Sequence, residues 1–178
     1  MTLEVRNIYP LTPTFKKVAS LYEAAFPVEE RLPLWQLSWN SLKNGQSFLA
    51  YFDQGVFIGF TYVICTDNLV YLLFLAVKES KQSQGYGSQI LAQVKKKAGV
   101  RPCVLTIEPM DEEQVSNRAQ RLKRLAFYER NGYQALNHFY FEGTERYQIL
   151  ITDRSLSLDT IEQDLAKTFL GRYGIKVD

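Results

Sequence analysis

Apolar and polar side chains repeat along this chain with two different periods, and the period predicts the type of each element. Strict alternation over residues 3–9 predicts a half-buried strand, whereas apolar residues three and four apart over 14–26 predict an amphipathic helix. The continuous apolar run 69–77 is typical of a central strand covered on both faces. The same criteria predict further strands at 46–53, 56–65, 103–107, 133–142 and 146–152, and helices at 34–42, 85–98, 111–130 and 157–170.

Capping residues and glycines separate these predicted elements. Asp111 is expected to cap a helix whose first turn holds Glu112 and Glu113, and Gly171 is expected to close the last helix. The resulting order, βααβββαβαββα, predicts an α/β (α+β layered) domain over residues 1–155. Residues 156–178 are expected to form a C-terminal helix that packs on the same domain or extends it.

Composition narrows the class of protein without naming an activity. With 178 residues, 46% apolar and 22% charged, the chain is expected to be a soluble, globular protein. A net charge of +2 gives no reason to expect nucleic acid or an anionic membrane as a partner. No leader or long apolar span is visible, which favours a cytoplasmic location. Cys65 and Cys103 sit in apolar runs and His138 is the only histidine, so no metal site is expected.

A glycine-containing crossing joins the apolar run 69–77 to the helix predicted after it. Glycine lets a backbone approach a ligand closely, and a helix N-terminus presents unpaired N–H groups, so this junction is a candidate anion site. No GxxxxGK[ST] phosphate loop occurs, and Ile90 stands where a dinucleotide fingerprint would place its third glycine. An ordinary strand-to-helix loop is the alternative.

Two segments of the chain resemble motifs of the GCN5-related N-acetyltransferase (GNAT) family. "QSQGYG", in which Gln82, Gly85 and Gly87 fill the defined positions, is similar to the cofactor motif Q/R-x-x-G-x-G/A. "RLKRLAFYERNGY" resembles the late helix and turn, in which a tyrosine, here Tyr128, precedes a glycine, here Gly132. The resemblance covers most of the chain up to residue 152, and it implies a central mixed twisted sheet flanked by helices.

The resemblance also implies a co-substrate, acetyl-CoA. The end of the apolar strand would pair with the pantetheine arm, and the N–H of Leu75 would face the thioester carbonyl. The backbone amides of the crossing would hold the pyrophosphate. The cofactor residues implied are Leu75, Ala76, Val77, Gln82, Ser83, Gln84, Gly85, Tyr86, Gly87 and Ser88. Lys95, Lys96 and Lys97 end the following helix and are expected to form a solvated face rather than a cofactor contact.

In the family, the tyrosine at the position of Tyr128 serves as a general acid near the thioester sulfur. A phenol suits this role because it donates a proton without carrying charge at neutral pH. An aromatic side chain packed in the core is the alternative. This chain has Arg121 where the family often has asparagine, and Arg124 lies one turn before the tyrosine; pairing with a glutamate in solvent is favoured over binding a CoA phosphate.

The carboxylate that several family members carry on the central strand is missing here, since the strand reads "VYLLFLAV". Glu108, at the end of the next strand in "LTIEP", is the best candidate for a general base, acting directly or through a water that it orders. A loop-capping role is the alternative for this side chain.

The segment "AFPVEERLP" is the candidate acceptor region, because the family commonly lines its acceptor pocket with the connection between the first two helices. Phe26 would supply an apolar wall, together with Leu32 and Trp35, and Glu29 and Glu30 would attract a cationic amine. Acidic side chains on an exposed loop are the alternative. The pattern FPxEERxP is similar to acetyltransferases of Gram-positive bacteria. His138 is expected to be a structural residue.

Together these features predict an N-acetyltransferase that moves the acetyl group of acetyl-CoA to a primary amine by direct transfer in a ternary complex. The acceptor would be a small molecule or a peptide. The alternative is a CoA-binding sensor or partner-binding domain without activity, supported by the missing strand carboxylate. A homodimer through the last hairpin or the helix at 157–170 stays open.

Overall fold

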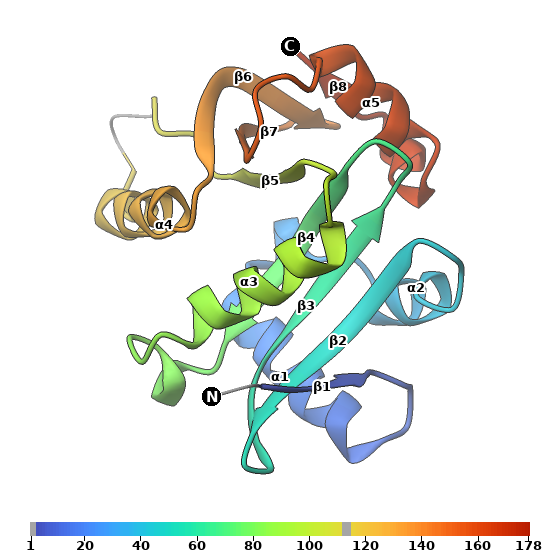
Figure 1. The fold of residues 1–178 in the computed structure, drawn as a ribbon, viewed down its shortest axis with the longest axis vertical. Helices are drawn as coiled ribbons and strands as arrows, with labels where there is room; N and C mark the ends of the chain where they lie inside the picture. The colour runs from blue at the N-terminus through green and yellow to red at the C-terminus, as the bar shows by residue number, and fades with distance from the viewer. Residues whose placement is uncertain (1–2, 112–114) are drawn as a thin grey trace. The chain divides into compact units, whose positions relative to one another are not determined.

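The computed structural model describes residues 3–111 and 115–178, whose strands form one open sheet flanked by helices (Figure 1). The order of strands across the sheet is β1-β2-β3-β4-β5-β7-β6-β8, and the predicted α/β class is confirmed. The elements are β1 (Glu4–Asn7), α1 (Pro13–Ala25), η1 (Val28–Glu30), α2 (Leu34–Asn40), β2 (Gln46–Asp53), β3 (Val56–Cys65), β4 (Val70–Val77), η2 (Glu79–Lys81), α3 (Tyr86–Ala98), β5 (Cys103–Ile107), α4 (Arg118–Arg130), β6 (Gln134–Glu142), β7 (Glu145–Ile151), α5 (Leu158–Ala166), η3 (Phe169–Tyr173) and β8 (Lys176–Val177).

The chain divides into two compact units, of which the first holds residues 1–65 and 72–97. Its strands β1, β2 and β3 pair antiparallel in chain order. Strands β2 and β3, both at predicted positions, form a hairpin that turns at Gln54 and Gly55, whose φ angles of 47° and 78° fit a two-residue loop that matches the strand twist. A register shift between Tyr51 and Phe52 bends β2 next to this turn.

Helices cover both faces of the sheet in the first unit. On one face, the Phe74 ring of β4 packs against Tyr22 and Phe26 at centroid distances of 5.1 and 5.0 Å, which fixes α1. On the other face, Ile90 of α3 lies in a buried cluster to which Leu75 also packs. Successive side chains of β4 therefore point to opposite helices, as strand geometry requires.

The second unit holds residues 66–71 and 98–178. Strand β7 pairs antiparallel with both β5 and β6, and β6 also pairs with the two-residue β8, an element that the sequence did not predict. Helix α5 is fastened by a buried carboxylate, because Asp164 accepts hydrogen bonds from Thr66 Oγ1 at 2.6 Å and from Asn68 Nδ2 at 3.1 Å. The C-terminal helix thus packs within this unit.

Helix α4 begins at Arg118, seven residues after the predicted start, so the expectation that Asp111 caps it is wrong. The Asp111 carboxylate instead pairs with the Arg146 guanidinium of β7, with Nη2 to Oδ1 at 2.7 Å. The predicted first-turn acids Glu112 and Glu113 lie outside the described residues. The capping prediction failed because the local sequence around Asp111 does not show its ion pair with a distant strand.

Two further expectations in the second unit need correction. The last helix ends at Ala166, and Gly171 lies inside the short helix η3, where any Cβ would collide with the Ala166 carbonyl. The left-handed residue that ends this segment is Gly174, with φ of 65°. His138, which was expected to be structural rather than catalytic, is exposed on β6 near a register shift.

Candidate active site

The crossing from β4 to α3 is an ordered loop whose own side chains bond its backbone. Gln82 Nε2 donates to the carbonyl of Val77 at 3.0 Å, and Gln84 Nε2 donates to the carbonyl of Ser80 at 3.0 Å. Ser83 and Gly85 adopt left-handed φ angles of 58° and 81°. The motif glutamine therefore ties the loop to the end of the strand, and the motif glycine supplies a backbone conformation that side chains disfavour.

The loop presents a run of backbone N–H groups. Within the residues that the structure describes, the amides of Ser83 to Ser88 donate to no backbone carbonyl, whereas the Gln82 amide donates to Glu79 O at 3.1 Å. The run opens α3, a helix of 13 residues, and the partial positive charge of the helix N-terminus adds to the same position. The local electrostatics therefore favour an anion with several oxygen acceptors.

Tyr86 anchors the start of α3 to the sheet. Its hydroxyl donates to Asp53 Oδ2 at 2.7 Å, and its ring packs against the buried cluster that contains Ile58 and Ile90. The motif position between the two glycines thus points inward, which fixes the loop while its backbone stays open. The sequence did not predict this contact, since Asp53 and Tyr86 lie 33 residues apart in the chain.

The end of β4 is held closely to β3. Lys78 N donates to the carbonyl of Ile58 at 2.8 Å, and Gly59 approaches so near to Ala76 that a Cβ would overlap the Ala76 carbonyl oxygen. Leu75 and Val77 are half-buried on the α3 side of the strand. The backbone predicted to pair with an extended ligand is therefore rigidly supported from its neighbour.

The candidate acceptor segment reaches the same strand on its other face. The Phe26 ring contacts the Phe74 ring, one residue before Leu75, and Arg31 Nε donates to the Phe26 carbonyl at 2.7 Å. Glu29 is exposed and lies in the short helix η1, which follows Phe26 at the end of α1. The predicted donor and acceptor segments thus converge on β4 within the first unit.

Trp35 and Leu32 were expected to supply apolar walls to this segment. Leu32 is buried, and its N–H and carbonyl bond the Tyr22 hydroxyl at 2.7 and 3.1 Å. Trp35 is 73% exposed on α2, together with Trp39 one turn later. Leu32 therefore supports the segment from beneath, and the tryptophans form its outer apolar surface.

Tyr128 belongs to the second unit, on the last turn of α4. Its side chain is buried, and its ring packs against those of Phe127 and Tyr133 at 5.1 and 5.7 Å between centroids. Burial raises the pKa of Tyr128 to about 12, and the nearby Arg124 cation opposes this rise. The phenol therefore keeps its proton throughout the neutral pH range.

Glu108 lies beyond β5 in the second unit, and donors engage both of its oxygens. Asn117 Nδ2 donates to Oε1 at 2.7 Å, and Arg124 Nη1 donates to Oε2 at 2.8 Å. Arg121 adds an ion pair with Oε1 at 3.4 Å. The sequence singled out the glutamate and both arginines but missed Asn117 and the cluster itself, because nothing local signals contacts between a strand end and a helix.

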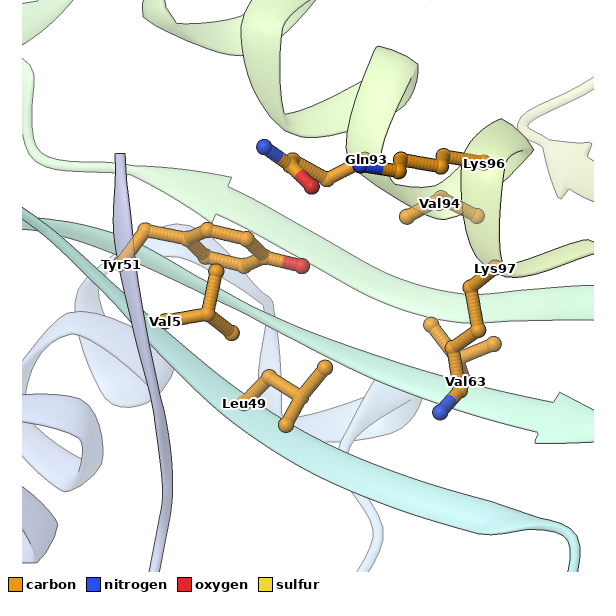
Figure 2. Close-up of a pocket in the computed structure, with 8 residues that line it drawn as sticks. All are labelled: Val5, Leu49, Tyr51, Val63, Gln93, Val94, Lys96 and Lys97. Carbon is orange, nitrogen blue, oxygen red and sulfur yellow. The ribbon is translucent and has the colours of Figure 1, made fainter. Parts of the chain in front are cut away.

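A separate cavity of about 420 Å³ lies at the far end of α3 (Figure 2). Aliphatic side chains of β1, β2, β3 and α3 line it together with Tyr51 and Gln93, and Lys96 and Lys97 also contribute to its lining. Because these lysines close the helix that the glycine loop opens, they lie away from the candidate anion site. Among the described residues no helix is long and apolar enough to cross a membrane, and no group of three acidic, histidine or cysteine side chains could hold a metal ion.

A family model described as an acetyltransferase (GNAT) domain matches residues 43–135, just over half of the chain. YjbC from Bacillus subtilis (strain 168), a protein named as an acetyltransferase, is 32% identical over 68 residues. That alignment covers 38% of this chain and 32% of the relative, so it spans about a third of the relative's length.

Solved structures resemble the fold over nearly the full chain. A GNAT-family acetyltransferase from Bacteroides thetaiotaomicron superimposes with a TM-score of 0.78 at 23% identity, covering 97% of this chain and 99% of the other. The PaiA N-acetyltransferase from Thermoplasma acidophilum, crystallised with coenzyme A, gives a TM-score of 0.57 at 22% identity, covering 86% and 99%. At these identities the similarity establishes the fold.

Proposed function

We propose that this chain, which belongs to the GNAT acetyltransferase family, moves the acetyl group of acetyl-CoA to a primary amine. The observation that carries this proposal is the run of amides at Ser83 to Ser88, which opens a helix at the end of β4. A diphosphate requires several hydrogen-bond donors, and the amides of this run, which have no backbone partner among the described residues, support its placement here. Acetyl-CoA is then a co-substrate, and we propose a cytoplasmic location for the reaction.

The donor would extend along β4 from this loop. Its pyrophosphate would lie against the free amides, its pantetheine arm would pair with the strand at Leu75 to Val77, and the Leu75 N–H would stabilise the oxyanion of the thioester carbonyl. The tie between Gln82 and Val77 supports this assignment, because it fixes the angle between the strand end and the loop.

The acceptor would be a small-molecule or peptide amine that enters over the segment from Phe26 to Glu30. Phe26 rests on Phe74, the neighbour of Leu75, so an amine bound there would lie along the strand that carries the donor. Glu29 and Glu30 would draw a cationic amine toward this position. Exposure of Glu29 to solvent agrees with a role in the first encounter.

The reaction would proceed by direct attack in a ternary complex. The amine nitrogen forms a bond to the thioester carbon, the carbon–sulfur bond breaks, and the departing thiolate takes the proton of Tyr128. The proton of the amine goes to a water ordered by Glu108, since both oxygens of this carboxylate already accept hydrogen bonds. The roles of Tyr128 as general acid and of a water at Glu108 as general base are proposed from the family resemblance. The buried phenol of Tyr128, which keeps its proton at neutral pH, is compatible with the role of general acid.

Purified protein should be assayed with acetyl-CoA and a panel of amines: polyamines, aminoglycosides, amino acids and peptides. Release of free thiol measures turnover. We expect at least one class to be acetylated, and a Tyr128→Phe variant to lose about two orders of magnitude in kcat with acetyl-CoA affinity retained. Phe127→Leu, on the same helix, is the matched control for lost aromatic packing.

The rival function is a CoA-binding domain without catalysis, favoured by the apolar strand β4, which lacks a carboxylate. Tight binding of acetyl-CoA without turnover on any amine, and a Tyr128→Phe variant equal to wild type, would establish the rival. A rise in melting temperature with ATP or NAD but not with CoA would contradict both readings.

A further inference from the structure

The cavity of about 420 Å³ at the C-terminal end of α3 lies wholly within the first unit (Figure 2). Its inner wall is well packed, because Tyr51, Val63 and Val94 are each at most 2% exposed. Val5 is 41% exposed and leaves one side open. The part of α3 that lines the cavity begins at Gln93, about 10 Å along the helix axis from the glycine loop. The cavity is therefore separate from the candidate donor site.

The lining of this cavity is suited to an apolar ligand body. Aliphatic side chains form most of it: Val5, Leu49, Val63 and Val94. A water molecule needs two to four polar partners to be held firmly, and an aliphatic wall offers few. An apolar group that displaces such water gains affinity. At the ~30 Å³ that one water occupies, the volume holds a ligand of roughly a dozen non-hydrogen atoms.

The Tyr51 hydroxyl brings a hydrogen-bond donor to the inner wall. It forms a buried hydrogen bond of 2.9 Å with the hydroxyl of Thr61, in which either oxygen is the donor. Two hydroxyls carry two hydrogens, so one hydrogen of this pair has no acceptor among the residues that the structure describes. Figure 2 shows the Tyr51 oxygen pointing into the cavity, and burial raises the pKa of Tyr51, so the phenol keeps its proton. A ligand atom that accepts a hydrogen bond would satisfy this pair.

The charge at the edge of the cavity is positive. Lys96 and Lys97, from the last turn of α3, are the charged residues of the lining, and no acidic side chain lines it among the described residues. The Lys96 ammonium forms no ion pair with a described residue. On β1, Glu4 pairs with Arg6 at 2.7 Å, and strand alternation turns both away from the face of Val5. The acceptor atom of a ligand here is therefore favoured to carry a negative charge.

We propose that this cavity is a binding site for a small carboxylic acid with an aliphatic body. The body packs against Leu49, Val63 and Val94, and the carboxylate accepts hydrogen bonds from the Tyr51 hydroxyl and the Lys96 ammonium. The flexible stem of lysine lets its ammonium reach the carboxylate. Such a site goes beyond acetyl transfer and does not depend on it.

The test compares three probes that share one aliphatic chain: hexanoate, hexanol and hexyltrimethylammonium. The quaternary ammonium cannot be acetylated, so its binding as an acceptor does not confuse the result. NMR of methyl-labelled valine reports binding at Val63 and Val94 directly. We expect hexanoate to shift both signals with a dissociation constant on the order of 1 mM, hexanol to bind severalfold more weakly, and the cation to leave both signals unchanged.

Matched variants separate the two polar contacts. Lys96→Met removes the charge and keeps the stem, and we expect it to weaken hexanoate binding about three- to fivefold. Lys95→Met, one residue earlier and outside the lining, is its control. Tyr51→Phe should weaken binding about tenfold. Tyr62→Phe also removes a buried phenol hydrogen bond, to the Leu37 carbonyl at 3.1 Å, and should leave hexanoate binding unchanged.

A third substitution tests the location. Val5→Trp fills the open side from an exposed position and should abolish the shifts at Val63 and Val94. Shifts that persist in this variant, or the absence of any saturable shift with hexanoate, would overturn the site. Equal binding of hexanoate and hexanol, or parent-like binding by Lys96→Met, would overturn the assignment of an anion. The Lys96 comparison decides this even if Tyr51→Phe fails to fold, because Lys96 is exposed.

Discussion

Substitution of Gly59 by alanine adds one methyl group that should displace strand β4, the strand proposed to bind acetyl-CoA. It lies in β3 against the end of β4, and a Cβ at this position would lie under 3.0 Å from the Ala76 carbonyl oxygen and 3.1 Å from Val77 Cα. Both contacts are with backbone, which cannot rotate away. Gly59→Ala should therefore push β4 at the residues proposed to pair with pantetheine.

The size of the effect follows from this geometry. Ordinary contact begins at 3.4 Å, so relief from under 3.0 Å requires the strand to retreat by more than 0.4 Å. Overpacking of this kind costs about 1–3 kcal/mol, and for a chain of this size each kcal/mol lowers the melting temperature by about 2–4 °C. Loss of one well-placed strand hydrogen bond to the ligand, about 1.4 kcal/mol, corresponds to roughly tenfold weaker binding.

Differential scanning fluorimetry and titration calorimetry with acetyl-CoA measure the two effects separately, the latter well below the melting temperature. Gly55→Ala is the matched control, since a Cβ at that hairpin turn meets nothing within 4 Å. Its φ of 78° still imposes strain, about 1 kcal/mol, so the control is destabilised without any push on β4.

We expect both variants to melt at lower temperature and only Gly59→Ala to bind acetyl-CoA more weakly. Equal affinity in the two variants would refute the assignment of the β4 end to the pantetheine arm. An unchanged melting temperature in Gly59→Ala would instead contradict the close approach of β3 and β4.

Three further outcomes are expected. Tyr86→Phe removes the hydrogen bond to Asp53 and should raise the KM for acetyl-CoA severalfold with kcat nearly unchanged, measured by steady-state kinetics. Gly85→Ala strains a residue with φ of 81° and open space around it, so calorimetry should show weaker CoA binding by about tenfold. Burial raises the pKa of Asp164, but the hydrogen bonds from Thr66 and others outweigh it, and the net pKa is lowered. The Asp164 carboxylate therefore stabilises the fold fully above its unfolded-state pKa near 3.8, and this stabilisation is lost as pH falls through its lower folded-state pKa. Asp164→Asn should lower the free energy of unfolding by about 1–3 kcal/mol at neutral pH and reduce the loss of melting temperature at acid pH.

Each of these outcomes has a contrary result that decides against its premise. An unchanged KM in Tyr86→Phe would show that the loop does not depend on its anchor. CoA binding by Gly85→Ala at wild-type strength would remove the glycine loop from the ligand site. An acid limb that persists in Asp164→Asn would assign the acid sensitivity to other carboxylates.

The sequence predicted the crossing from strand to helix at residues 77–86 because its signal is local. Gln82, Gly85 and Gly87 stand at fixed spacing between an apolar strand and an amphipathic helix, and the structure has a strand, a loop and a helix at those positions. The period of the apolar residues likewise located the strands and helices, because burial of one face depends on neighbours in the chain.

Features fixed by distant residues could not be read in the same way. Helix α4 starts later than predicted, and Asp111, the expected cap, pairs with Arg146 on β7. The side chain of Asn117, at the actual helix start, donates to Glu108 and does not cap the helix backbone. The strand β8 is two residues long and has no period at all. The hydrogen-bond partners of Glu108 could not be predicted for the same reason, since Asn117 and Arg124 lie later in the chain, at the start of α4 and within it.

The alternation of side chains along β4 has a consequence for how this protein can diversify. Phe74 packs against Tyr22 of α1 and against Phe26 of the candidate acceptor segment, whereas Leu75 and Val77 pack on the opposite face, toward α3. Under the proposed function, substitutions at Phe26 or Phe74 can change which amine is preferred. Binding of acetyl-CoA on the opposite face of the strand would be retained. Under the proposed function, the acceptor preference can therefore change in evolution through residues on one face of β4, while residues on the other face continue to bind acetyl-CoA.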